Sequence, residues 1–510
     1  MRSPNDLRKF VNEAAALLAR EKDLAAFEVY ASTAEHRVAR LNYTSDIPSR
    51  GVEEFKSLNA DGFMIRIVMR RDAHEIGSAS TAGDLSLDAV RDALSRARRS
   101  LIVDPHFPGF ATEPRKLGVA RAVGASDLIR VNDGVLAKAA WQIVGSAIAA
   151  FEKRAPLKLA HPGLVIGGDL SLVRDRIAIT NSSFDDIRSD ESAHFSSSVS
   201  ALVEALDAKG TATAVGGSAD TMRRAAAGLG KEAVTRALEL RHGERPPAGT
   251  YRVLLGPQPV AEILNYMIMP SLTTGAFHAA SSAYHGRFGA QVMDARLSLI
   301  DDPLARIGPV RRRITCEGIP AAPSELIRGG RLVGLLSNFY DGHRLLTDEH
   351  RAEKLGPHAE GALAFPPRSG YRLGESAARR FDSTPGSTGT NVIMRTRDGM
   401  AESKMVAAVG DGIYIGRVWY TYPINGQRAG DVTCTVSGDS YVIRNGRLAA
   451  PLAPNCLRIN ANIREIFTAP LAVGKRSEPA VVWGAPEAFF VPAIAADGIT
   501  LSAVGASDSE

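Results

Sequence analysis

The first half of the chain alternates between helix-like and strand-like patterns of hydrophobic positions. Four segments repeat apolar side chains every three or four positions, which predicts amphipathic helices. They are residues 5–20, 86–98, 132–153 and 222–240, and Ser86 is the expected N-cap of the second. Other segments alternate apolar and polar side chains, which is typical of half-buried strands. They are residues 27–33, 36–43, 62–69, 77–81, 164–173, 176–180, 194–206 and 211–217, with a turn expected at Arg174-Asp175.

A proline-containing connection divides the chain. Residues 241–249 include Pro246 and Pro247 and have the composition of a linker. We therefore expect an N-terminal domain over residues 1–245 and a C-terminal domain over residues 250–510. The order of helix, several strands and helix in the first domain favours an antiparallel sheet with flanking helices.

The second half is predicted to be rich in β-structure. It opens with a strand over residues 250–255 and a helix from Val260. From Arg296 onward, short strand-like segments are separated by Gly, Asp and Asn, and Asn445-Gly446 is a strong hairpin signal. The sequence thus predicts an α+β fold, with an N-terminal antiparallel sheet and flanking helices, and a C-terminal β-rich, barrel- or sandwich-like domain.

Composition and charge narrow the class of protein. At 510 residues the chain is too long for one ordinary core, so two or three domains are expected. Hydrophobic residues make up 45% and charged residues 23%, as in soluble globular proteins. The net charge of +5 is spread over the chain, with no basic run longer than residues 311–313. This distribution argues against nucleic-acid binding, which needs a concentrated basic face.

Cysteine usage and the N-terminal sequence indicate the compartment. The three cysteines, Cys316, Cys434 and Cys456, lack Cys-x-x-Cys spacing, which excludes a disulfide scaffold and a cysteine-rich zinc knot. Free thiols fit a reducing compartment. The first ten residues lack the apolar core of a signal peptide, and no stretch is expected to be apolar for long enough to span a bilayer. We expect a cytoplasmic protein without membrane contact.

Several stretches carry a family resemblance. They are Tyr251-Arg-Val-Leu-Leu-Gly-Pro-Gln-Pro-Val-Ala-Glu-Ile-Leu264, residues 297–303 with 316–320, residues 409–415 with 438–446, and Gly484-Ala-Pro486. In this order they resemble the TldD/PmbA family of metallopeptidase-related proteins, and residues 62–80 with the helix after them are similar to its N-terminal domain. The resemblance implies an α/β N-terminal domain and a C-terminal β domain that encloses a peptide channel.

The zinc motif of this family is incomplete in the chain. TldD-type members carry His-Glu-x-x-x-His, in which two histidines bind zinc and the glutamate takes a proton from bound water. At the matching window Glu262 is present, but Ala261 and Tyr266 stand where the histidines would be. The chain is therefore similar to the PmbA-type (TldE-type) partner, which forms a complex with a zinc-bearing TldD-type subunit. The resemblance implies no catalytic residue and no metal or cofactor in this chain, with zinc in the partner.

Two histidines further along are candidate substrate-binding residues. On a continuous helix, His278 and His285 would lie two turns apart, about 10 Å by helical rise. That is too far for one metal ion unless the chain breaks at Ser281-Ser282. The alternative is a polar or interface helix.

Other polar clusters are weaker candidates for a metal site or a catalytic site. Three histidines lie among acidic residues, which fits either a metal site or a solvated loop. The cluster comprises His343, His350 and His358 with Asp348, Glu349, Glu353 and Glu360. His74-Glu75 lacks a second histidine and is expected at a turn. The serine-rich residues 196–198, 281–282 and 437–439 lack a Gly-x-Ser-x-Gly elbow. Cys434 alternates with Val432 and Val436, which favours a buried thiol.

Residues 416–425 form a candidate peptide-binding strand. Arg417 is followed by three aromatic residues, Trp419, Tyr420 and Tyr422. Asn425 begins the next turn. Aromatic side chains with an arginine can line a groove that accepts an extended peptide by β-augmentation. A half-buried strand that packs its aromatics on the core explains the same pattern. The sequence leaves both alternatives open.

Three functional hypotheses follow. The leading one is a TldD/PmbA-type peptidase subunit that shapes the peptide channel, acts on unstructured peptide, and leaves the zinc chemistry to a TldD-type partner in a heterodimer. A second is a non-enzymatic peptide-binding or assembly protein that forms a homodimer. A third is a metallopeptidase with non-standard ligands. Maturation of a ribosomally made peptide and clearance of an unfolded antitoxin-like protein are both open as substrates.

Overall fold

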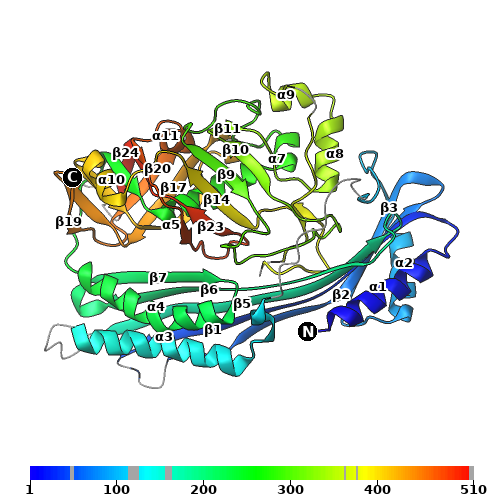
Figure 1. Cartoon of the computed structure of the whole chain (residues 1–510), viewed down its shortest axis with the longest axis horizontal. Coiled ribbons are helices and arrows are strands. Elements are labelled where there is room, and N and C mark those ends of the chain that lie inside the picture. The colour runs from blue at the N-terminus through cyan, green and yellow to red at the C-terminus, as the bar shows by residue number, and fades with distance from the viewer. Residues whose placement is uncertain are drawn as a thin grey trace.

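Two lobes make up the computed structural model of the chain (Figure 1). The structure describes residues 1–45, 47, 51–112, 126–154, 163–360, 363–374 and 377–504, and for residues 72–74 the backbone alone. The N-terminal lobe is one long curved sheet with helices on its outer side. The C-terminal lobe lies on the inner side of that sheet and contains most of the short strands. The predicted α+β class is confirmed.

The N-terminal sheet is antiparallel and has the strand order β4-β3-β2-β1-β5-β6-β7. Its strands are β1 (Leu24–Thr44), β2 (Lys56–Met69), β3 (Asp72–Ala82), β4 (Ile102–Val103), β5 (Leu164–Asn181), β6 (Arg188–Val203) and β7 (Ala208–Gly216). Because β1 has 21 residues, it spans roughly 70 Å at the usual rise per residue. The sheet is therefore long enough to carry two separate pairs of helices.

Two predicted strand breaks are wrong. The segments 27–33 and 36–43 belong to the single strand β1, and 164–173 and 176–180 belong to β5. Arg174 and Asp175 lie in mid-strand, where Arg174 donates to Glu35 at 2.7 Å and Asp175 accepts from Arg379 at 2.8 Å. Side chains distant in the sequence pair with the two charged residues that the sequence pattern had placed in a turn. Similarly, His74-Glu75 lies within β3 and not at the turn, because β3 already begins at Asp72.

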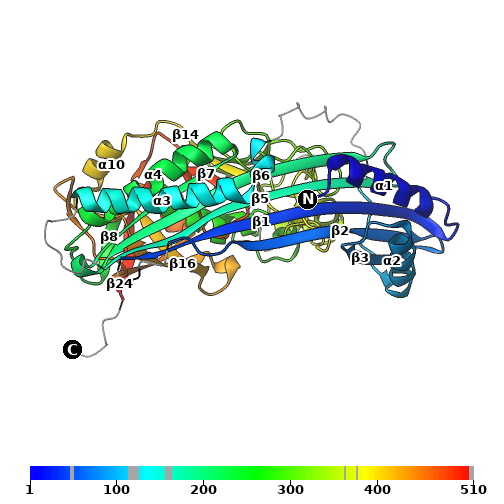
Figure 2. The ribbon, with the colours of Figure 1, turned by 90° about the horizontal axis from the view of Figure 1, so that it is seen from below.

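Helices cover the outer face of this sheet (Figure 2). The helices α1 (Pro4–Leu18) and α2 (Leu87–Arg99) pack over one end, and α3 (Asp133–Arg154) and α4 (Ala219–Glu239) over the other. Residues of β1 with odd numbers, such as Val29 and Leu41, contact these helices. Even-numbered residues, such as Tyr30, face the C-terminal lobe. All four predicted helices are confirmed, and Ser86 caps α2 by accepting from Ala89 N–H.

One described helix, α3, is long and apolar enough to cross a membrane by length and composition. The expectation that no segment meets these criteria is therefore wrong. In the structure its apolar side chains, including Leu136 and Ile143, are buried in the core that α3 shares with α4 and the sheet. A core helix of this kind passes the same criteria, so the finding is weak evidence for membrane contact.

The C-terminal lobe is built around a nine-stranded and a six-stranded sheet. The nine-stranded sheet has the main order β16-β17-β20-β24-β8-β15-β18-β19, and the other has the order β11-β10-β9-β14-β23-β22. Asn445 and Gly446 have positive φ angles of 50° and 69° in the turn between β18 and β19, so the predicted hairpin is confirmed. The largest hydrophobic core among the described residues lies between these sheets and the helices that follow β8.

The remaining elements of this lobe have the following bounds. The strands are β8 (Gly249–Leu255), β9 (Leu297–Asp301), β10 (Ser324–Arg328), β11 (Arg331–Leu332), β12 (Gly370–Tyr371), β13 (Gly386–Ser387), β14 (Asn391–Thr396), β15 (Gly412–Ile415), β16 (Arg417–Pro423), β17 (Asp431–Gly438), β18 (Tyr441–Arg444), β19 (Arg447–Pro451), β20 (Leu457–Asn462), β21 (Ala472–Val473), β22 (Glu478–Ala480), β23 (Ala488–Val491) and β24 (Ile494–Ala503). The helices are α5 (Pro257–Ile263), the π-helix η3 (Leu264–Ile268), α6 (Met269–Ser271), α7 (Thr274–His278), α8 (Phe339–Thr347), α9 (Arg351–Leu355), α10 (Glu402–Val409) and α11 (Ile463–Phe467).

Buried arginines of the C-terminal lobe bind carboxylates on the inner face of the N-terminal sheet. Arg379 is fully buried and donates to Asp175 and to Asp190, each at 2.8 Å. Arg313 also donates to Asp190, at 2.7 Å. Since these charges are removed from water, each needs its partner in place. The contacts therefore fix how the two lobes sit on each other.

A second contact of the same kind lies further along the sheet. Arg372, also fully buried, donates to Glu28 at 2.5 Å and stacks over the ring of Tyr30 at 4.6 Å. Arg66 donates to both oxygens of Glu28, at 2.9 and 3.0 Å. Burial alone would raise the pKa of Glu28, but Arg66 and Arg372 outweigh that effect and lower the pKa below its ordinary value. The carboxylate is thus held ionised between the lobes.

Replacing Arg379 with Met should destabilise the chain by about 3–5 kcal/mol, because Asp175 would be left as a buried charge without its partner. Thermal or urea unfolding measures the effect. Arg397→Met, which removes an exposed ion pair with Asp398, should cost at most about 1 kcal/mol. Adding Asp175→Asn to Arg379→Met should restore part of the lost free energy of unfolding. If it restores none, an unpaired buried Asp175 carboxylate is not the cause of the loss.

Candidate functional site

The window around Glu262 lies on a short helix that leaves the end of β8. Gly256 precedes α5 and donates its N–H to Ile415 O at 2.9 Å, and Pro257 occupies the first helical turn. After α5 the chain forms the π-helix η3, which includes Tyr266. Single π-turns are rare and recur at functional sites. The window therefore lies where the backbone departs from a regular α-helix.

The Gln258 amide connects this helix to the edge strand β16. It accepts from Val418 N–H at 2.9 Å and donates to Val418 O at 3.2 Å. Its second N–H donates to Glu262 Oε1 at 2.9 Å. Both the oxygen and the nitrogen of the amide are therefore hydrogen-bonded. The amide bonds to the backbone N–H and O of Val418 as the backbone of a neighbouring strand would.

The Glu262 carboxyl is buried in a poorly solvated environment. Its side chain is 6% exposed. Burial raises its pKa to about 7, although Thr421, Arg417 and Gln258 act in the opposite direction. Its charge also raises the pKa of two neighbours, Cys434 and Tyr266, in both of which burial is the larger cause. Glu262 thus lies near a buried thiol and a partly exposed phenol.

These groups do not form a zinc site of the usual kind. Catalytic zinc needs three protein ligands, and a thiol must lose its proton to bind metal. Here the two histidine positions hold Ala261 and Tyr266, and the pKa of Cys434 is raised, which favours the protonated thiol. Throughout the described part of the chain, no three His, Cys, Asp or Glu side chains are grouped so that they could hold a metal ion.

Three aromatic side chains of β16 lie exposed at the edge of the nine-stranded sheet. Trp419, Tyr420 and Tyr422 are 40%, 68% and 46% exposed. The pairing with β17 slips between Trp419 and Tyr422, and Tyr420 has a positive φ of 49°, so the strand carries a β-bulge that turns its side chain outward. The Lys209 ammonium of β7 lies 4.9 Å from the Trp419 ring centre. The edge strand thus meets the N-terminal lobe at its first aromatic residue.

The two polar residues predicted beside these aromatics are engaged by other side chains. Arg417 is mostly buried and donates to Asp439 at 3.4 Å. Asp439 also accepts from the backbone N–H of Thr211 in β7, at 3.3 Å. Asn425 lies in the turn after β16 with a φ of 37° and donates to Asp431 at 3.1 Å. Arg417 therefore helps to hold the lobes together, and Asn425 stabilises a turn.

The two candidate histidines have separate partners. The helix α7 ends at His278, and Ala280 has a positive φ of 53°, so His278 and His285 do not share a helical face. His278 lies 3.1 Å from Asp348, which also pairs with Lys354 at 2.6 Å. His285 lies 3.4 Å from Arg428. In both histidines burial is the main cause of a lowered pKa.

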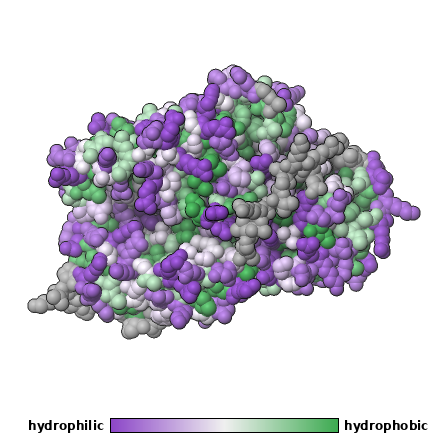
Figure 3. All heavy atoms as spheres, viewed as in Figure 1, coloured by the Kyte–Doolittle hydropathy of each residue, from purple (hydrophilic) through white to green (hydrophobic). Residues whose placement is uncertain are grey.

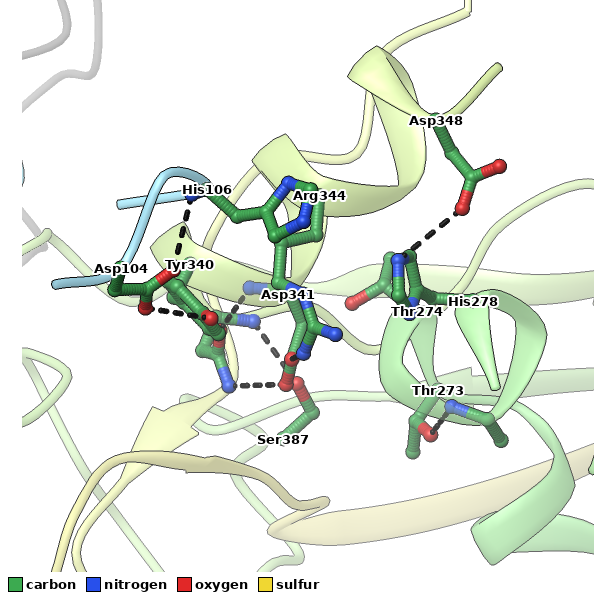
Figure 4. Close-up of polar contacts among 12 residues, drawn as sticks. Asp104, His106, Thr273, Thr274, His278, Tyr340, Asp341, Arg344, Asp348 and Ser387 are labelled. Carbon is green, nitrogen blue, oxygen red and sulfur yellow. Dashed lines mark hydrogen bonds and ion pairs between the residues drawn. The ribbon is translucent and has the colours of Figure 1, made fainter. Parts of the chain in front are cut away.

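His278 belongs to a polar cluster between α7, α8 and the residues after β4 (Figure 4). Tyr340 donates to Asp104 at 2.8 Å, which connects α8 to the N-terminal lobe. The Arg344 guanidinium stacks over the Tyr340 ring at 5.1 Å, and its charge contributes to the lowered pKa of His278. Opposite charges from Asp341 and Asp348 balance this cluster. The cluster therefore forms a contact between the lobes.

Sequence patterns did not reveal a cavity of about 370 Å³ between the lobes. Its floor is the inner face of the N-terminal sheet, and its roof is the segment that joins β22 to β23. The polar lining residues are His36, Asp169, Ser171, His194, Ser196, Ser197, Ser198, Trp483 and Glu487. Figure 3 shows hydrophobic side chains near the middle of one face, at the level where the lobes meet. The serine-rich residues 196–198 were noted in the sequence, but no local motif groups them with the other lining residues, which are distant in the chain.

Comparisons with known proteins agree with this architecture. Residues 248–503 match the family model described as the PmbA/TldA metallopeptidase C-terminal domain. The crystal structure of TldE from Thermococcus kodakarensis is similar with a TM-score of 0.74 and 14% identity, over 98% of this chain and 99% of that one. Comparison with curated protein sequences gives no match.

Two further solved structures have the same fold. A candidate modulator of DNA gyrase from Thermotoga maritima gives a TM-score of 0.69 with 16% identity, over 97% of this chain and 99% of that one. A protein of the same description from Bacteroides thetaiotaomicron gives 0.68 with 15% identity, over 98% and 99%. The two-lobe architecture and the match over the C-terminal half define a metallopeptidase-related protein. The chain belongs to the TldD/PmbA family, as the sequence motifs indicated.

Replacing Glu262 with Gln should stabilise the chain above about pH 7 and have little effect near about pH 4.5. The folded-state pKa of about 7 exceeds the ordinary value of 4.5, so the unfolded chain ionises first. The wild-type free energy of unfolding therefore falls as pH rises through this window, by roughly 3 kcal/mol from this group. The introduced amide oxygen can still accept from Gln258.

Chemical unfolding of the wild type and of Glu262→Gln across this pH range measures the difference between their free energies of unfolding. The contribution of the other acids cancels in this difference. Glu152→Gln on the exposed face of α3 is the control and should give parallel curves. Parallel curves for Glu262→Gln as well would show that the Glu262 carboxyl is not held in a poorly solvated environment.

Proposed function

We propose that this chain is the non-zinc subunit of a cytoplasmic TldD/PmbA-type peptidase. It would shape the peptide channel and pair with a TldD-type subunit that supplies zinc and activated water. The observation that carries the proposal is the use of Gln258 and Glu262 at the motif position. The Gln258 side chain holds α5 against β16 and donates to Glu262, and the positions of the two motif histidines carry no imidazole.

The proposed role in peptide binding is supported by β16. An edge strand with exposed aromatic side chains offers backbone groups to an extended peptide and flat surfaces to its side chains. Gln258 already occupies the outer edge at Val418, so an incoming peptide would pair beyond that residue, along Tyr420–Tyr422. The bulge at Tyr420 limits how long such a pairing can run.

The purified chain alone should hold less than about 0.1 zinc per chain and should not cleave an unstructured peptide, because three protein ligands are lacking. Adding a family member with His-Glu-x-x-x-His should give a zinc-containing complex with peptidase activity. Metal analysis and cleavage of a fluorogenic peptide test this. A matched variant of the added member with its glutamate replaced by glutamine should bind this chain and zinc but not cleave.

Stoichiometric zinc with cleavage by this chain alone would overturn the proposal in favour of a metallopeptidase with non-standard ligands. A stable homodimer that binds peptide and never associates with a zinc-bearing family member would favour the non-enzymatic alternative. Size-exclusion chromatography with light scattering distinguishes these outcomes from the proposed heterodimer.

Replacing Tyr420 and Tyr422 together with Ser should raise the KM of the complex for an unstructured peptide by about five- to fiftyfold, with kcat little changed. Loss of contacts made equally in the ground state and the transition state has this effect. Leu448→Ser, an exposed apolar residue on the opposite edge strand β19, is the control and should leave KM unchanged. If the double variant no longer associates with the zinc-bearing subunit, β16 is the subunit interface and not the peptide site.

A further inference from the structure

We propose that the cavity between the lobes is a subsite for a cationic side chain, Lys or Arg, of the bound peptide. The inference rests on the proposed peptide-binding function and adds a preference for one class of peptide to it. It is carried by the shape of the cavity, by the acceptors on its walls, and by the charges around it.

The size of the cavity suits one side chain. At about 370 Å³ it lies at the low end of ligand pockets. One part of its wall is apolar and comes from both lobes. The apolar residues include Val38, Val173, Val215, Val310 and Val482. Walls of this kind accommodate the methylene stem of a lysine or arginine while the charged head reaches polar groups.

The polar part of the wall presents hydrogen-bond acceptors. Alternate residues of adjacent strands point to the inner face, and the pairings Asp169↔Ser198 and Ser171↔Ser196 place them side by side. His194 is nine-tenths buried, lines the cavity, and has no hydrogen-bond partner among the described residues. Burial is the first cause that lowers its pKa to about 3, so the ring is neutral and offers a nitrogen lone pair.

Two carboxyl groups face the same space, and none of the described lining residues is Lys or Arg. Burial raises the pKa of Asp169, and the nearby Trp483 acts in the opposite direction. Glu487 lies deep in the molecule yet keeps accessible surface, because it faces the cavity. A cation near a tryptophan face and two carboxyls gains both charge pairing and cation–π attraction.

The acidic side chains around the cavity outnumber the cations that act on them. Arg312 is the nearby cation for both Glu487 and the buried Asp301, and burial and Asp301 raise the pKa of Glu487 to about 7. Arg40 is the cation that acts to lower the pKa of Asp169, and it also pairs with Glu53. The three acids Asp169, Asp301 and Glu487 therefore face two shared arginines. A ligand cation would supply the missing charge and favour the ionised form of Glu487.

Trp483 gives the site an exposed entrance. It is 76% exposed at the roof, and Gly484 beside it has a positive φ of 77°, which a side chain there would strain. The indole can therefore contact both the cavity and a peptide that passes outside it. The motif Gly484-Ala-Pro486, noted in the sequence, forms part of this roof.

Isothermal titration of the full chain with blocked pentapeptides tests the subsite. The probes are acetyl-Ala-Ala-Lys-Ala-Ala-amide and the same peptide with norleucine or Glu in place of Lys. At about pH 8 the Lys peptide should bind at least about tenfold more tightly than the norleucine peptide, because a charge-assisted hydrogen bond is lost in the latter. The preference should shrink to about threefold or less near pH 6, where Glu487 is mostly protonated.

Glu487→Gln and Asp169→Asn should each reduce the Lys preference to about threefold or less without weakening norleucine-peptide binding. Glu478→Gln, on β22 but outside the cavity, is the matched control and should retain the preference. Because norleucine-peptide binding reports an intact fold, a variant that unfolds is recognised. Three results would each overturn the proposed subsite. They are equal binding of the Lys and norleucine peptides, tighter binding of the Glu peptide, and an unchanged Lys preference in Glu487→Gln.

Failure of the subsite differs from failure of the proposed function. If the complex with a zinc-bearing family member cleaves Lys and norleucine peptides equally well, the subsite is wrong and the function stands. If the chain binds the Lys peptide with the stated preference but no complex cleaves any peptide, the subsite stands and the peptidase role fails.

Discussion

The buried arginine–carboxylate contacts between the lobes are the constraint on which the rest of the structure depends. Arg372 and Arg379 have no access to solvent, and their partners Glu28, Asp175 and Asp190 lie on the inner face of the N-terminal sheet. Charges in such a place are tolerated only when they are paired. A small slide of one lobe over the other would break several pairs at once. These paired charges therefore help to fix the relative position of the lobes, beside apolar contacts such as those of Tyr30 and Ile179 with Phe381.

This polar interface explains the unusual character of the N-terminal sheet. Its outer face is covered by four helices and is apolar, as expected for a sheet that packs on helices. Its inner face carries acids, histidines and serines that meet the C-terminal lobe. Where arginines reach across, the charges are neutralised. Where they do not, the cavity remains, with acids such as Asp169 and Glu487 that burial makes harder to ionise.

The side chains around Glu262 stabilise the fold. The Gln258 amide pairs with Val418 as a neighbouring strand would, and its remaining N–H stabilises Glu262. The carboxyl that would act on zinc-bound water in a TldD-type subunit here contacts an amide and lies beside Cys434. Ala261 and Tyr266 at the two imidazole positions are the basis of the proposed division of labour between two subunits. In it, this subunit contributes surfaces, namely the β16 edge and the cavity between the lobes.

The sequence by itself determined the four long helices of the N-terminal lobe, the α+β class, the hairpin at Asn445-Gly446 and the missing histidines, because each depends on residues close together in the chain. It misplaced a turn at Arg174-Asp175, since charged residues in mid-strand are stable only when partners from elsewhere pair with them. The family motifs located Glu262 but not its contacts with Gln258. Only the tertiary structure brought His194, Asp169 and Glu487 around one cavity, because pairing of β5 with β6 places Asp169 and His194 on one sheet face and packing of the lobes adds Glu487.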